Sequence, residues 1–232
     1  MGRKICRKNE NRLEPACHSL MNQVNKIRIM RYKHLLIFAL IIPLLGLNNC
    51  STKKDKKTGT EINRPVTSGS VAPAPGISIH DAAMNGKAAD VTALLKAGTK
   101  VDTTDKDGRT PLMYASFNGH SEIVSLLIRN GANVNLADNF GRTALMMASS
   151  GPYPMAVKIL LDQKADPNLV DKEEHFTALM YAAAEGQTEV VKILLLYNAD
   201  PALKDIDGDN ALTFARNNGH NAIVTLLESL NK

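Results

Sequence analysis

The sequence predicts an all-α fold: a solenoid of stacked helix-turn-helix units with short β-hairpin tips, after a disordered N-terminal region. Three observations predict it. Related segments recur about every 33 residues through residues 77–232. Each segment holds two short stretches with apolar residues at helical spacing, and turn residues such as glycine end these stretches. Residues 51–75, in contrast, are rich in Lys, Thr, Ser, Gly and Pro and offer little to bury.

The first 29 residues are polar and precede a segment with the features of an export signal. Such signals normally start within a few residues of their basic lead, and Met30 is followed at once by a basic stretch. We therefore predict that translation begins at Met30, which makes residues 1–29 a non-translated extension, or alternatively at Met21, with the residues before it not translated.

Residues 30–49 are predicted to form a secretory signal peptide. A basic lead precedes 13 uncharged residues, 35–47, which is the layout of such a signal. A helix of that length reaches only about 20 Å, short of the roughly 30 Å hydrocarbon core of a bilayer. A permanent membrane span is therefore not expected.

Cys50 directly follows this segment. The residues before it, Leu47, Asn48 and Asn49, resemble the lipobox of bacterial lipoproteins, in which cleavage occurs in front of a cysteine that is acylated. Asn49 departs from that family, which usually has Gly, Ala or Ser there. The resemblance implies that acyl chains on Cys50 tether the protein to a membrane, durably if there are two or three chains. The alternative is an ordinary signal peptide beside a chance cysteine.

Residues 50–76 are predicted to be a lipidated, flexible linker with a mean reach of about 25–30 Å.

The N-terminal region and the repeats differ in net charge. Residues 1–76 carry 14 Lys/Arg and 4 Asp/Glu, whereas residues 77–232 carry 14 Lys/Arg and 19 Asp/Glu. The mildly acidic repeat region argues against nucleic-acid binding.

The chemistry-bearing residue types give no recognisable catalytic or metal site. All three cysteines, Cys6, Cys17 and Cys50, precede the repeats, which excludes a disulfide scaffold there. No Cys/His set has zinc spacing, and no Ser/His/Asp, Cys/His or phosphate-loop pattern occurs in a suitable context. We therefore predict no catalytic residue, no metal site and no cofactor.

The repeats align on four residues that are 33, 34 and 33 positions apart. These are Thr110, Thr143, Thr177 and Asn210. Thr110 begins the motif Thr-Pro-Leu-Met, a Gly-His step occurs at residues 119–120 and 219–220, and Gly-Ala-Asn-Val-Asn occupies residues 131–135. This period and these motifs resemble the ankyrin repeat. The resemblance implies about five repeats in residues 77–232, whose tips and first helices line a concave, partner-binding surface.

The repeat that begins at Thr110 shows how each unit is built. Thr110 is predicted to cap a helix at residues 111–118, with Pro111 at its first position. Gly119 permits the left-handed turn that ends this helix, and a second helix is predicted at residues 121–129. One unit cannot bury its apolar face alone, so neighbouring units are expected to stack into a continuous core.

Departures from the pattern predict where the stack is least regular. Lys164 and Asn198 stand where glycine usually follows the second helix, and a left-handed backbone costs lysine about 1 kcal/mol. Residues 151–154 replace the Gly-His step, and Pro154 is expected to start a helix. The tip at residues 171–177 is one residue longer than the others and lacks glycine.

Two sets of residues at repeating positions invite a chemical interpretation. A methionine series could bind a soft metal, but methionines commonly fill gaps between packed units, and we expect the latter. This series comprises Met113, Met146 and Met180. His120 and His220 are expected to hydrogen-bond the backbone of their own or a neighbouring repeat rather than to act as ligands or bases.

The predicted site is a protein-binding surface at the tips. Aromatic and arginine side chains dominate interface energetics, and a phenylalanine at a tip has little to pack against. The predicted contact positions, which match contact sites of the family, are Lys106, Arg109, Phe117, Asn139, Phe140, Arg142, Lys172, Glu173 and Phe176. Further positions of this kind are Asp107, Asn118, Glu174 and Glu185. Of these residues, we expect Phe140 in particular to contact the partner.

The sequence therefore predicts a monomeric, non-catalytic scaffold for an unidentified protein partner. We expect it to be exported and anchored to a bacterial membrane through acylated Cys50, facing the periplasm or the cell surface. One alternative is a soluble exported ankyrin protein that acts on a host or periplasmic partner. The other is an enzyme with an unrecognised site, which would need a deep polar pocket with perturbed titrating groups.

Overall fold

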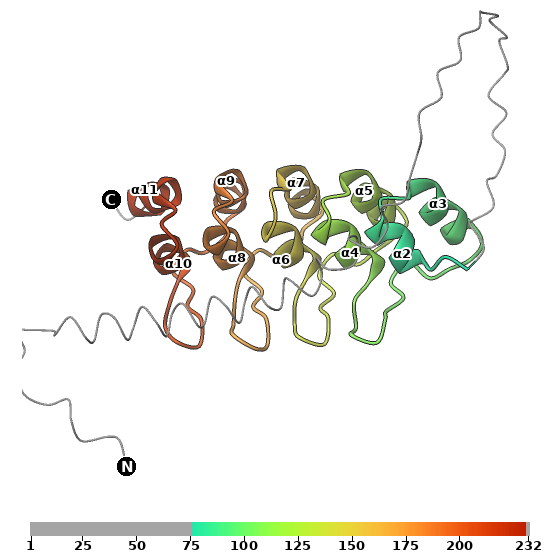
Figure 1. The fold of residues 1–232 in the computed structure, drawn as a ribbon, viewed down its shortest axis with the longest axis horizontal. Coiled ribbons are helices and arrows are strands. Elements are labelled where there is room, and N and C mark those ends of the chain that lie inside the picture. Colours follow the sequence, from blue (N-terminus) through green and yellow to red (C-terminus); the bar gives the residue numbers. More distant parts are fainter. Residues whose placement is uncertain (1–75, 231–232) are drawn as a thin grey trace, which may run out of the picture. The chain divides into compact units, whose positions relative to one another are not determined.

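A computed structural model describes residues 76–230 of the chain. Five successive helix pairs make up these residues (Figure 1). The pairs are α2 (Ile79–Met84) with α3 (Ala88–Lys96), α4 (Pro111–Phe117) with α5 (Ser121–Arg129), α6 (Ala144–Ser149) with α7 (Pro154–Asp162), α8 (Ala178–Ala184) with α9 (Thr188–Leu196), and α10 (Ala211–Asn217) with α11 (Asn221–Ser229). The first helices form one row, the second helices form another, and the long loops between pairs project beyond the first row.

This arrangement confirms the predicted all-α solenoid. The two helices predicted at residues 111–118 and 121–129 are present as α4 and α5. The predicted signal peptide, Cys50 and nearly all of the linker lie outside the described residues. Within residues 76–230, every helix is too short or too polar to cross a bilayer.

Side-chain caps start the first helix of each pair. Thr110, Thr143 and Thr177 each accept a hydrogen bond from the backbone N–H three residues later, at 3.2–3.3 Å. Asn210 does the same at the start of α10, at 3.1 Å. Pro111 occupies the first turn of α4, where a backbone N–H has no acceptor within the helix, so the lack of this group in proline costs no hydrogen bond. The four alignment positions are therefore four helix caps.

The methionine series fills the core between repeats, as expected. Met113, Met146 and Met180 are each only 1% exposed. The sulfur atoms of Met113 and Met146 lie 3.4 and 3.5 Å from the backbone nitrogens of the capping threonines. All three methionines thus pack the interior, and Met113 and Met146 also cover the start of their own helices.

The two histidines connect neighbouring repeats. The Nε2 atom of His120 lies 3.0 Å from the carbonyl oxygen of Met84, and that of His220 lies 3.1 Å from the carbonyl oxygen of Ala184. These carbonyls belong to the last turn of the first helix one repeat earlier, where helical carbonyls lack intrahelical partners. The predicted structural role is confirmed.

Tyr153 stands where these histidines stand in their repeats. Its ring packs against Gly119, because a Cβ atom built on Gly119 would lie 2.1 Å from the ring. Gly119 also has a left-handed backbone, with φ of +69°. Gly131 has a φ of +88°, but a Cβ there would meet no atom within 4 Å.

The predicted irregular positions adopt strained backbone conformations. Lys164 and Asn198 have φ values of 67° and 63°, as expected for residues that replace glycine. His175 has a φ of 58° in the tip that lacks glycine. Pro154 begins α7, as predicted.

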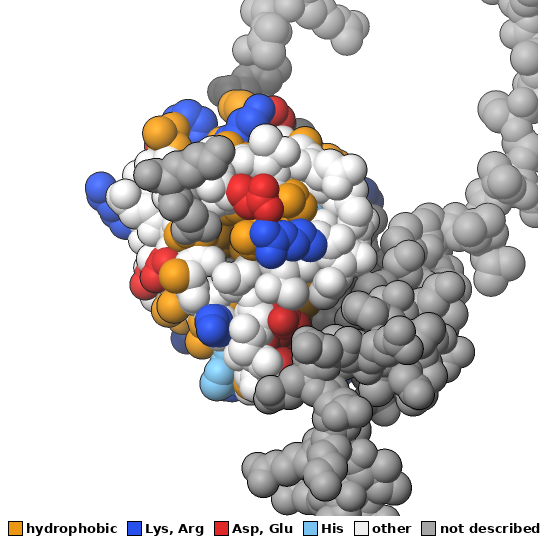
Figure 2. Space-filling model, turned by 90° about the vertical axis from the view of Figure 1, so that its left-hand side faces the viewer, with side chains coloured by type: hydrophobic (Ala, Val, Ile, Leu, Met, Phe, Trp, Pro, Cys, Tyr) orange, Lys and Arg blue, Asp and Glu red, His pale blue; other side chains and the backbone are white. Residues whose placement is uncertain are grey.

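Polar side chains cover the face of the last helix pair. Arg216 stands where Ser116 is fully buried, and Glu228 stands where Leu161 is 4% exposed. The two side chains form a salt bridge of 2.6 Å between α10 and α11. Thr213 replaces the core methionine of the three preceding repeats. Figure 2 views this end of the stack and shows charged side chains among the hydrophobic ones, as is typical of a terminal repeat.

Candidate partner-binding surface

Four loops between helix pairs form a continuous edge, which we call the tip row. They are residues 105–109, 138–142, 171–176 and 205–209. Each loop begins with an aspartate that is buried or half-buried. These aspartates are Asp105, Asp138, Asp171 and Asp205.

One oxygen of each aspartate closes its own tip. Asp105 Oδ1 accepts hydrogen bonds from the N–H groups of Asp107 and Arg109, both at 2.9 Å, and the Asp105 N–H donates to the carbonyl of Arg109 at 3.1 Å. The loops at residues 138–142 and 205–209 repeat this pattern. Because side chains take up these N–H groups, the tips are narrow turns. In the described part of the chain, β-pairing at the tips is limited to one isolated bridge, Ala137–Thr143.

The second oxygen of the aspartate is held by a donor that differs between repeats. The Tyr114 hydroxyl donates to Asp105 Oδ2 at 2.6 Å, and the Tyr181 hydroxyl donates to Asp171 Oδ2 at 2.8 Å. The second repeat in this series has methionine at the tyrosine position. There, Arg142 donates to the oxygen Oδ2 of its own tip aspartate through two nitrogens, at 3.0 and 2.8 Å.

These contacts shift the titration of Asp105 and Tyr114. Burial raises the pKa of Asp105, but hydrogen bonds from Tyr114 and from the backbone lower it more, so that it lies below the ordinary value of 3.8. Burial and the hydrogen bond to Asp105 raise the pKa of Tyr114 above its ordinary value of 10.0. At neutral pH a neutral phenol therefore donates to a carboxylate, which makes a strong hydrogen bond.

The fourth tip lacks such a donor. Phe214 stands at the tyrosine position, and Asp209 stands where the second tip has its arginine. Asp205 is 6% exposed, and its Oδ2 atom has no hydrogen-bond partner among the residues that the structure describes. The last tip is therefore fastened less completely than the other three.

Backbone hydrogen bonds join neighbouring tips. They run from the N–H of Asn139 to the carbonyl of Asp107 (3.0 Å), from Lys172 to Phe140 (2.9 Å) and from Ile206 to Glu174 (3.2 Å). Each tip is thus fixed both to its own repeat and to the next one. The tip row is therefore a pre-ordered edge.

The structure places most of the predicted contact residues along this edge. The exposed ones are Lys106, Asn139, Lys172 and Glu173, and the half-buried ones are Arg109, Phe140 and Arg142. Phe117 is also half-buried, but it is the last residue of α4 and lies outside the tip row. The Arg142 guanidinium lies over the Phe140 ring, 4.7 Å from its centroid. Asn139 also donates its side-chain amide to the carbonyl of Lys106, at 3.2 Å.

Phe176 is a correction to the predicted set. It is 5% exposed and packs against Phe214 and Tyr181, with ring centroids 4.8 and 5.6 Å apart. The extra residue in the third tip explains the error. Phe176 directly precedes the capping threonine, so it aligns with Arg142 rather than with Phe140, and its side chain belongs to the core.

Sequence reasoning missed the groups that hold the tips in place. Asp105, Asp138, Asp171 and Asp205 recur at the same position of each repeat, and this recurrence was the available signal. The tyrosines were harder to identify because their partner lies nine or ten residues away. Within residues 76–230, no group of three or more His, Cys, Asp or Glu side chains is arranged to hold a metal ion.

Stacked helix pairs, each of which packs against its neighbours, define the class of helical repeat proteins. The family model described as ankyrin repeats in three copies matches residues 79–171 and 151–232. The match covers well over half of the chain, which therefore belongs to the ankyrin-repeat family. A comparison with curated proteins finds no match.

The family indicates the general function. Ankyrin repeats are typically non-catalytic modules that bind other proteins, and the match includes no catalytic domain. Membership therefore indicates a protein–protein interaction scaffold with a protein partner.

Proposed function

We propose that the tip row binds a partner protein through the stacked Phe140–Arg142 pair, while acyl chains on Cys50 hold the scaffold beside a bacterial membrane. The observation that carries the first part is the geometry of this pair. Phe140 and Arg142 lie near the middle of the row, and the ring and guanidinium stack at 4.7 Å. Aromatic and arginine side chains are the commonest energetic centres of interfaces.

The pair is pre-ordered for binding. Arg142 is fixed by two hydrogen bonds to Asp138, whose side chain is fully buried. The carbonyl of Phe140 accepts a hydrogen bond from the next tip. A partner that contacts this pair therefore loses less conformational entropy than it would on a mobile loop.

Charge along the tip row favours a partner with a basic segment. By formal count the tips at residues 105–109 and 138–142 are neutral, whereas residues 171–176 carry −2 and residues 205–209 carry −3. A segment that contacts Phe140 and continues toward α10 meets an increasingly negative edge. Such complementarity affects association rate and orientation more than affinity.

The membrane tether rests on the sequence before the described residues. The 13 uncharged residues 35–47 are followed by two residues and then Cys50, and the linker that the sequence predicts after it would let the repeats face outward. Detergent partition of protein from its native cells tests this part. We expect the mature protein in the detergent phase, with a mass above that of its polypeptide, and Cys50→Ala in the aqueous phase. Wild-type protein in the aqueous phase at polypeptide mass would instead support the soluble exported alternative.

Photocrosslinking in native cells tests the binding surface. A photoreactive residue at Asn139 should capture a discrete protein, and Phe140→Ala should reduce the yield because it removes the ring of the central pair. The same residue at Lys192, exposed on α9 away from the tips, is the matched control. Equal capture from both positions would show that the tip row is not the binding surface.

A further inference from the structure

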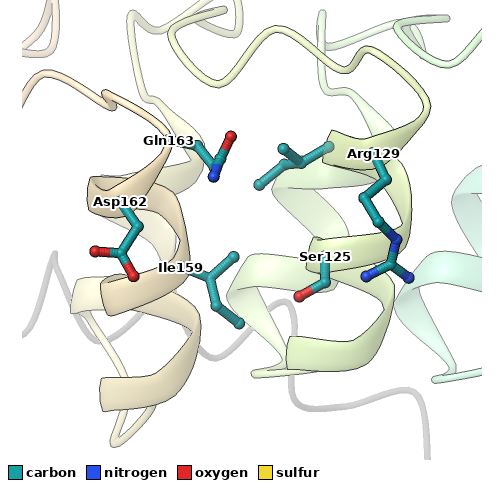
Figure 3. A pocket seen from close by; sticks show the side chains of 6 residues that line it. Ser125, Arg129, Ile159, Asp162 and Gln163 are labelled. Atoms are coloured by element: carbon teal, nitrogen blue, oxygen red, sulfur yellow. The ribbon is translucent and has the colours of Figure 1, made fainter.

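A groove of about 310 Å³ lies between α5 and α7, in the row of second helices. Six residues line it: Ser125, Ile128 and Arg129 from α5, and Ile159, Asp162 and Gln163 from α7. Figure 3 shows Ile159 and Gln163 extending from α7 toward α5, whereas Asp162 points away from α5. The lining is therefore mixed: Ile128 and Ile159 supply aliphatic surface, and Ser125, Arg129 and Gln163 supply polar groups.

Comparison with the next pair of second helices explains why this groove is open. Tyr197 of α9 occupies the position that Gln163 has one repeat earlier. Its hydroxyl donates to Asp162, so an aromatic side chain bridges α7 and α9. Gln163 is shorter, and no hydrogen bond joins it to Arg129 within residues 76–230.

The charges around the groove leave one cation uncompensated. Arg129 is exposed and makes no salt bridge with any residue that the structure describes. The carboxylate of Asp162, in contrast, accepts hydrogen bonds from Lys158 at 2.8 Å and from Tyr197. Its charge is therefore offset on the side away from the groove. A ligand in the groove meets a positive edge, two aliphatic side chains and the polar groups of Ser125 and Gln163.

We propose that this groove is a second docking site, which binds a peptide segment that carries an acidic side chain next to an aliphatic one. The carboxylate pairs with Arg129, and the aliphatic side chain covers Ile128 and Ile159. Charge complementarity selects this occupant over a basic segment of the kind expected at the tip row. The groove lies in the row of second helices and the tip row lies beyond the row of first helices, so one partner can engage both sites or two partners can bind together.

The groove alone gives weak binding, because its volume accommodates only one or two side chains. A ligand portion of about 12–14 non-hydrogen atoms is expected to bind with a Kd of about 1 mM or weaker. An exposed ion pair contributes about 0.2–1 kcal/mol, which corresponds to a change of up to about fivefold in Kd. Combined with binding at the tips, such a contact raises the total affinity through effective concentration.

An NMR titration of the ¹⁵N-labelled full chain tests the proposal. The probes are the capped peptide Ser-Glu-Leu-Leu-Ser and its counterpart with Gln in place of Glu. We expect saturable shifts of amide signals in α5 and α7, with the Glu peptide bound about two- to fivefold more tightly. Arg129→Gln should abolish this preference, and Gln163→Tyr should weaken both peptides by filling the groove.

Lys96→Gln is the matched control, because Lys96 holds the position of Arg129 one repeat earlier. It should bind both peptides as the wild type does. Shifts confined to the tip row, a preference that survives Arg129→Gln, or shifts that do not saturate would each overturn the proposal. Because the tip row is not altered in these variants, this outcome is independent of the crosslinking result at Asn139.

Discussion

Replacing Phe214 by tyrosine should stabilise the last repeat. Phe214 stands where Tyr114 and Tyr181 donate to a tip aspartate, and Asp205 Oδ2 is buried without a partner in the described structure. A buried, unsatisfied acceptor costs about 1–3 kcal/mol, and a typical intramolecular hydrogen bond contributes about 1 kcal/mol net. The new hydroxyl must leave water to reach Asp205. We therefore expect Phe214→Tyr to raise the free energy of unfolding by about 1 kcal/mol.

Urea denaturation and a thermal melt would measure this effect. For a chain of this size, a gain of about 1 kcal/mol raises Tm by about 2–4 °C. Tyr114→Phe is the mirror experiment, because it removes the 2.6 Å hydrogen bond to Asp105 and should lower the free energy of unfolding by about 1 kcal/mol. An unchanged or lower stability of Phe214→Tyr would refute the argument that equivalent positions hold equivalent donors.

Three further changes test other parts of the structure. Gly119→Ala should cost about 2–5 kcal/mol, because it adds a clash with the Tyr153 ring to a left-handed backbone, whereas Gly131→Ala carries only the backbone cost of about 1–2 kcal/mol. If urea denaturation showed that Gly119→Ala and Gly131→Ala lower the free energy of unfolding equally, the Tyr153 ring would not restrict position 119. Met146→Ala should cost about 2–5 kcal/mol, since the side chain is 1% exposed, and calorimetry that showed a loss below 1 kcal/mol would exclude a core role. Because the pKa of Asp105 is lowered in the folded state, this carboxylate stabilises the fold at pH values above its unfolded pKa of 3.8. The stabilisation is lost as the pH falls through the folded pKa. Asp105→Asn should therefore flatten the acid side of the stability profile below about pH 4, and an unchanged slope there would contradict the assignment.

Local sequence signals were sufficient for the helical framework. The threonines at 33- and 34-residue spacing cap the first helices, and Pro154 begins α7. Lys164 could be placed in a left-handed turn because the repeat alignment puts it where glycine normally stands. Each of these features depends on residues within a few positions of one another, so the pattern of one repeat predicts the others.

Contacts across repeats were less accessible to sequence reasoning. One inserted residue moved Phe176 from an apparent tip position into the core, beside Phe214 of the following repeat. The groove between α5 and α7 depends on Gln163 standing where the next repeat has Tyr197, and only the packed helices show what that difference leaves open. The sequence pattern predicted where these side chains stand within a repeat. It did not predict which side chains of the neighbouring repeat they contact.

Within each tip, the residues that hold the loop in place differ from the residues that a partner would contact, and this affects how the protein can diversify. The first residue, an aspartate, holds the loop to its own helix pair, and each pair of neighbouring loops is joined by a hydrogen bond between main-chain atoms, to which the Asn139 side chain adds one bond to the carbonyl of Lys106. Side chains at the intervening positions, such as Lys106, Asn139 and Ile206, can therefore be exchanged without undoing the fastening. Substitutions at these positions can change binding specificity while the helix pairs keep their structure. Libraries randomised at these positions should therefore retain folded members.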